Sequence, residues 1–92
     1  MFGPASQAYP ELVRLAGGPD AVARRANELA ASDPLLALYL TDMALAADRA
    51  NRIGLQARIA ALQALERAST NSNERGWLAA GIRQTQAALD GR

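Results

Sequence analysis

Residues Pro34–Ala47 read PLLALYLTDMALAA, and they determine the architecture of the rest of the chain. On a helical projection their apolar side chains lie on almost every side, and only Thr41 and Asp42 are clearly polar. A helix that is apolar on most sides is packed on most sides. The stretch is too short for a membrane span, which needs about 20 apolar residues. We therefore expect a central helix that is covered by other segments of the chain, by a partner chain, or by both.

Proline, glycine and capping residues mark where the helices begin and end. Gly17 and Gly18 should close the first helix, because a glycine just past a helix end adopts the left-handed conformation without steric cost. Asp33 directly before Pro34 is typical of a helix start, since it combines a side-chain acceptor with proline in the first turn. The sequence predicts five helices and no strand: about Pro10–Ala16, a second from Pro19, Pro34 to Asp48 or Arg49, about Asn51–Ala68, and a last one ending near Leu89.

The predicted fold is therefore all-α, an antiparallel bundle of about five helices. Short loops between helices favour antiparallel neighbours. The central and fourth helices form a hairpin with the small-and-large patterning of a tetratricopeptide unit, but only one such unit is visible. One repeat cannot bury its faces alone, which points to a partner or to flanking helices. We predict a flexible N-terminal segment at residues 1–8, where Gly3 and Pro4 act as breakers, and a helical domain at residues 9–92.

The composition excludes several kinds of chemistry. The 92 residues include no cysteine and no histidine, which excludes disulfides, Cys or His zinc sites and histidine-based catalysis. The net charge is +1 with no clustered basic face, which argues against binding to nucleic acid or to an anionic membrane. The first residues do not resemble a signal peptide, and the lack of cysteine does not decide between cytoplasm and periplasm. We expect no catalytic, metal-binding or cofactor-binding residue in this chain.

Individual residues offer a few alternatives. Trp77 is the single tryptophan, and we favour a core anchor over the alternative of an interface anchor. Asp42, inside an apolar helix, should be buried and paired with an arginine, because an unpaired buried charge is costly. If the chain were a peptide-binding module, Arg52 and Arg83 would be candidate groove residues, although charged residues at helical spacing are more often solvated.

The start and middle of the chain resemble a known family. Residues 15–22 read LAGGPDAV and have Ala26 behind them. They are similar to the LAGGADAV segment that opens the helical dimerisation domain of the alkyl sulfatases, which are sulfate-ester hydrolases with a metallo-β-lactamase fold. Residues 46–48, together with Asn51, resemble the turn written FADPDN in that family.

The end of the chain resembles the same domain. Asn71, Arg75 and Gly81 keep the spacing of the Asn, Arg and Gly in the family segment ENATWRNFYLTGAQ, and Trp77 occupies its aromatic position. Asn71 also has the spacing of a capping box with the glutamate three residues later. The resemblance covers about residues 9–86. The chain departs from the family pattern at Arg49, Glu74, Gly76 and Leu78.

The resemblance implies a homodimerisation module that supports an upstream metallo-β-lactamase-like domain and is either excised from a longer hydrolase or encoded alone. The zinc ligands of the family lie in that separate domain and no residue here matches them, so zinc is expected only there. The alternative is a tetratricopeptide-like module that binds a peptide or ligand. Candidate dimer-interface residues on the central and last helices are Leu35, Leu38, Tyr39, Trp77, Leu78 and Ile82. The structural motif residues are Gly17, Gly18, Asp33, Asn71, Arg75 and Gly81.

Overall fold

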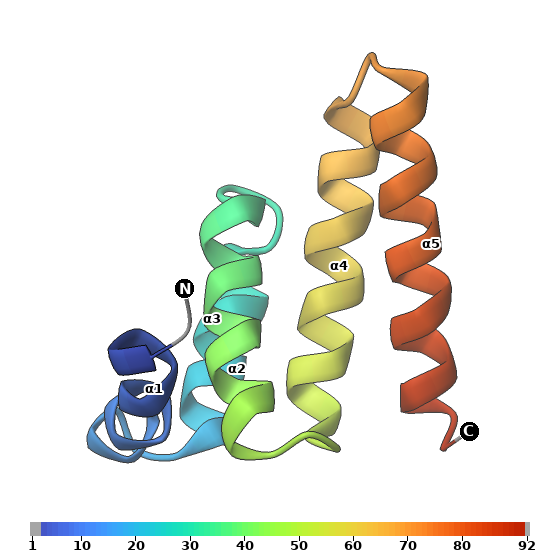
Figure 1. The fold of residues 1–92 in the computed structure, drawn as a ribbon. Helices are drawn as coiled ribbons and strands as arrows, with labels where there is room; N and C mark the ends of the chain where they lie inside the picture. Colours follow the sequence, from blue (N-terminus) through green and yellow to red (C-terminus); the bar gives the residue numbers. More distant parts are fainter. Residues whose placement is uncertain (1–2, 92) are drawn as a thin grey trace.

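A computed structural model describes residues 3–91, with side chains from residue 8 onward, and shows an all-α fold (Figure 1). This part of the chain contains five helices and no strand, as predicted. Consecutive helices run antiparallel where they pair, and short loops join them. The helices are α1 (Gly3–Leu15), α2 (Pro19–Leu29), α3 (Pro34–Ala47), α4 (Arg52–Ala68) and α5 (Ser72–Leu89).

The predicted start of the first helix was wrong. Helix α1 begins at Gly3 and carries Pro10 in its interior, so residues 3–8 are helical. Pro4 lies in the first turn of α1, where a missing N–H costs nothing, and it therefore starts the helix where we expected a breaker. Residues 1–2 of the predicted flexible segment lie outside the described residues.

The other helix boundaries follow from local capping. Gly17 and Gly18 have φ of +107° and +100°, the left-handed conformation that favours glycine. The side chain of Asp33 accepts a hydrogen bond from the backbone N–H of Leu36 at 3.3 Å, so it caps α3 as predicted. Asn71 caps α5 in the same way.

Helix α4 is the structural centre of the bundle. It packs against α2, α3 and α5, whereas α1 packs against α3 and, less closely, α2. Helix α5 contacts α4 and none of the other helices in the described chain. Helix α3 likewise packs against three helices, α1, α2 and α4, as expected for a helix covered by other segments of the chain, and among the described helices only α4 reaches α5. In Figure 1, α4 separates α5 from the rest of the bundle.

Small side chains line the contacts among α2, α3 and α4. One core cluster is built from five buried alanines, and a second contains Val13, Val22, Ala23 and Ala44. A Cβ atom added at Gly54 would lie 3.2 Å from Cδ2 of Leu45, which explains a glycine inside α4 as the point where α3 approaches closely. Val22, Ala23 and Ala26 form the buried face of α2. The members of the first cluster are Ala26, Ala30, Ala37, Ala57 and Ala61.

Candidate interaction surface

Large apolar side chains are exposed on α3 and α5. Leu35 and Tyr39 point outward from α3 with 54% and 59% of their surface exposed, and Trp77 of α5 is 81% exposed. The core-anchor interpretation of Trp77 was therefore wrong, because most of this side chain lies in solvent on the flank of α5. Scattered apolar residues are normal on a protein surface, and the informative feature is whether they share one face.

Two contacts of α4 indicate that the exposed residues of α3 and the exposed Trp77 of α5 lie on the same face of the bundle. The guanidinium of Arg58 donates a hydrogen bond to Asp42 of α3 at 2.8 Å. One turn further along α4, Leu62 packs against Gly81 of α5. A Cβ atom added at Gly81 would lie 3.3 Å from Leu62 Cδ1. Residues four apart lie on one side of a helix, so this strip of α4 joins the flank of α3 to the flank of α5.

Helical spacing also places the exposed residues of α3 and α5 next to this strip of α4. Leu35 lies two turns before Asp42 on one side of α3, and Trp77 lies one turn before Gly81 on one side of α5. Tyr39 follows Leu35 by one turn. We call these three exposed residues, Leu35, Tyr39 and Trp77, the apolar face.

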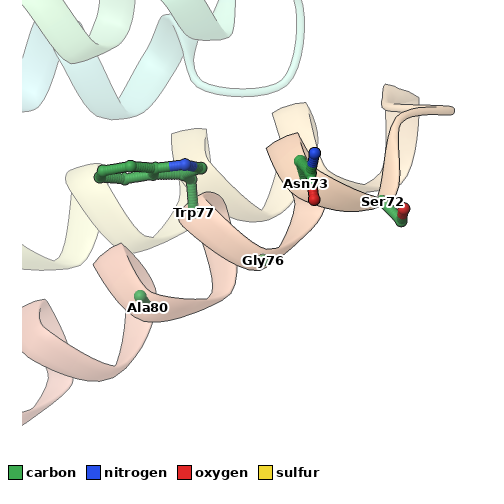
Figure 2. A pocket seen from close by; sticks show the side chains of 5 residues that line it. All are labelled: Ser72, Asn73, Gly76, Trp77 and Ala80. Atoms are coloured by element: carbon green, nitrogen blue, oxygen red, sulfur yellow. The ribbon is translucent and has the colours of Figure 1, made fainter.

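A shallow recess of about 310 Å³ lies next to Trp77 (Figure 2). Trp77 and Asn73 project from the same side of α5, and in this view they point toward the ribbons of α2 and α3. At Gly76 an added Cβ would meet no atom within 4 Å, so the floor of the recess is open. None of the lining residues is charged: Ser72, Asn73, Gly76, Trp77 and Ala80.

The remaining interface candidates contribute less exposed surface. Leu38, Leu78 and Ile82 are each half-buried, and Leu38 packs against the alanine cluster of the core. Of the predicted structural motif residues, Gly81 adjoins α4, whereas Arg75 is exposed. Leu35, Tyr39 and Trp77 are therefore the exposed part of the predicted set, on α3 and α5, two helices that do not contact each other.

The charged candidates are engaged in local structure. Asp42 has the arginine partner we predicted, but the expectation of burial was wrong, because 53% of its side chain is exposed. Arg52 donates to the backbone carbonyl of Leu89 at 3.3 Å and so satisfies an acceptor at the end of α5. Arg83 is exposed.

Sequence reasoning missed a polar junction at the start of α4. The buried side chain of Asn51 donates to the carboxylates of Asp20 and Asp48, and its oxygen accepts the backbone N–H of Gly54 at 2.8 Å. The sequence indicates a helix start at Asn51. It does not indicate the contact with Asp20 of α2, because that residue is far away in sequence. The junction is structural because every buried side-chain polar atom in the described residues has a hydrogen-bond partner.

Sequence reasoning also missed the recess. Ser72, Gly76 and Ala80 follow one another at four-residue spacing, which was the available signal. Among residues 3–91, no group of three or more His, Cys, Asp or Glu side chains is arranged to hold a metal ion. The recess itself offers the indole of Trp77 beside the polar side chains of Ser72 and Asn73.

No helix in the described range has the length and apolar character needed to cross a membrane. Function must be argued from the surface itself, since comparison with models of protein families, with curated proteins and with solved structures found no match.

Proposed function

We propose that this chain is a non-catalytic assembly module that forms a homodimer through the apolar face. The observation that carries the proposal is the exposure of Trp77, 81%, on the same face as Leu35 and Tyr39. Aromatic side chains bury about 150–250 Å² each at an interface, and tryptophan is enriched among the residues that dominate binding energy. Covering this face with a second copy would remove its apolar surface from water, which favours association.

The resemblance to the alkyl sulfatase dimerisation domain supports the same proposal. Under it, an upstream metallo-β-lactamase-like domain would carry the zinc and the hydrolytic activity, and this chain would hold two such domains together. Leu12 and Leu15 of α1 are exposed outside the apolar face and are available for contact with that domain.

Sedimentation equilibrium over a range of protein concentrations tests the proposal. We expect a reversible transition from the mass of one chain to the mass of two. Trp77→Gln should weaken the dimer by about 2 kcal/mol, or about 30-fold in dissociation constant. The matched control is Leu15→Gln, which removes an apolar side chain of similar exposure, 71%, from α1. The mass of a single chain at every concentration would overturn the proposal, as would equal effects of the two substitutions.

A second candidate function is a tetratricopeptide-like module that binds an extended peptide. The recess beside Trp77 favours it, because an aromatic side chain next to Asn73 could contact an apolar residue and a backbone amide of a peptide. Trp77 is the only tryptophan, so its fluorescence reports directly on this region. A blue shift that follows added peptide, in a protein that stays a single chain, would select this function over the dimer.

A further inference from the structure

Helix α5 leaves most of its side chains exposed to solvent. It packs against α4 alone, and of its eighteen residues only Thr85 is buried. By contrast, α4 has five buried residues and three helix neighbours. An edge helix of this kind leaves one broad side free, and the recess and Trp77 both lie on it.

We propose that in the dimer α5 of one copy lies antiparallel to α5 of the other, and that Trp77 of each copy fills the recess of its partner. This inference rests on the proposed function and specifies its geometry. A twofold axis brings the same surface of both chains together, so that residue i contacts j and j contacts i. A large side chain directly beside a recess on one helix meets this requirement, because a half-turn places each side chain opposite the other recess.

The charges of this surface agree with pairing between identical copies. Residues near a twofold axis lie close to their own counterparts, so a charged residue there would meet a like charge. The five residues that line the recess are all uncharged. The chain as a whole carries a formal charge of only +1, so long-range repulsion between two copies is weak.

Small residues in α5 allow the two helices to approach closely. Gly76 presents no side chain and Ala80 only a methyl group, one turn apart on the recess. Interaxial distances of packed helices are about 8–10 Å and depend on the side chains at the contact, with small residues giving the shorter values. A close approach at this point is what would allow the indole of the partner to reach the floor of the recess.

The contact area that a stable dimer needs indicates that residues of α3 also belong to the interface. A stable interface buries about 800 Å² on each partner, whereas one aromatic side chain supplies about 150–250 Å². An α5 pair alone therefore falls short of this area. Leu35 and Tyr39 lie on the same face as Trp77 and would supply further contact to α5 of the partner.

Cysteine cross-linking tests the arrangement cleanly, because the natural chain has no cysteine. Gly76→Cys and Ala80→Cys, in separate proteins, place thiols at the proposed centre of the pair. Gln63→Cys, at an exposed site on α4, is the matched control. Cysteines that face each other in a dimer have a millimolar effective concentration, so treatment with a short bismaleimide at micromolar protein should give at least about tenfold more covalent dimer than in the control.

Sedimentation equilibrium on the same variants separates the possible failures. If they form dimers but cross-link no better than Gln63→Cys, the α5 pairing is overturned while the proposed function stands. If the natural chain does not form a dimer, both fail. A variant that keeps its helical circular dichroism but loses the dimer supports the pairing, provided that Gln63→Cys retains it.

Discussion

At the scale of single residues, Asn51 shows how one side chain can connect distant parts of the chain. Its amide oxygen caps α4 while its amide nitrogen donates to Asp20 in the first turn of α2. Asn71 performs only the first of these tasks, at the exposed start of α5. The two asparagines therefore allow the contribution of a helix cap to be separated from that of a long-range contact.

We predict that Asn51→Ala lowers the free energy of unfolding by about 2 kcal/mol and Asn71→Ala by about 1 kcal/mol. Loss of a helix cap typically costs about 1 kcal/mol, and Asn51→Ala also removes hydrogen bonds that join α2 to the α3–α4 junction. Urea unfolding, followed by circular dichroism on the single chain at low concentration, measures both values. Equal losses would mean that the contacts of Asn51 with Asp20 and Asp48 contribute no stability.

At the scale of the helices, stability should follow the number of neighbours. Helix α4 has three, whereas α5 has one and leaves most of its side chains in solvent. Local opening costs less free energy where few apolar contacts are lost. The two helices of the last hairpin should therefore differ in dynamics although they pair along their length (Figure 1).

We predict that backbone amides of α5 exchange with solvent faster than those of α4 when the protein is a single chain. Native-state hydrogen exchange at low protein concentration measures the difference for each amide. At concentrations where two chains associate, the amides near Trp77 should gain protection and those of α2 should change least. Equal protection of α4 and α5 in the single chain would contradict this view of α5.

The sequence predicted the helices better than their arrangement. Capping signals are local, so Asp33, Asn71 and the Gly17–Gly18 pair located helix ends that the structure confirms. The neighbours of each helix depend on contacts between distant segments, which local patterns do not report, so the position of α4 between α3 and α5 was not predicted. Trp77 was misplaced for the same reason, since composition alone does not indicate that α5 has a single neighbour.

At the scale of the whole molecule, the bundle is held together mainly by small side chains. Seven of the eleven buried hydrophobic residues among those described are alanine, and the only large aliphatic ones are Val13, Val22, Leu55 and Leu62. Alanine allows close contact between helices but removes little apolar area from water for each residue. The bundle therefore combines tight packing with a small apolar core.

This core has a consequence for calorimetry. Unfolding raises the heat capacity in proportion to the apolar area that becomes hydrated, typically by about 12–15 cal/mol/K per residue. Alanine exposes little apolar area on unfolding, so the heat-capacity increment of the dilute single chain should fall below that range. Differential scanning calorimetry measures this increment, and a value within or above the range would contradict the prediction. A small increment flattens the curve of unfolding free energy against temperature, so this bundle should resist cold denaturation better than a domain of equal size built on leucine and phenylalanine.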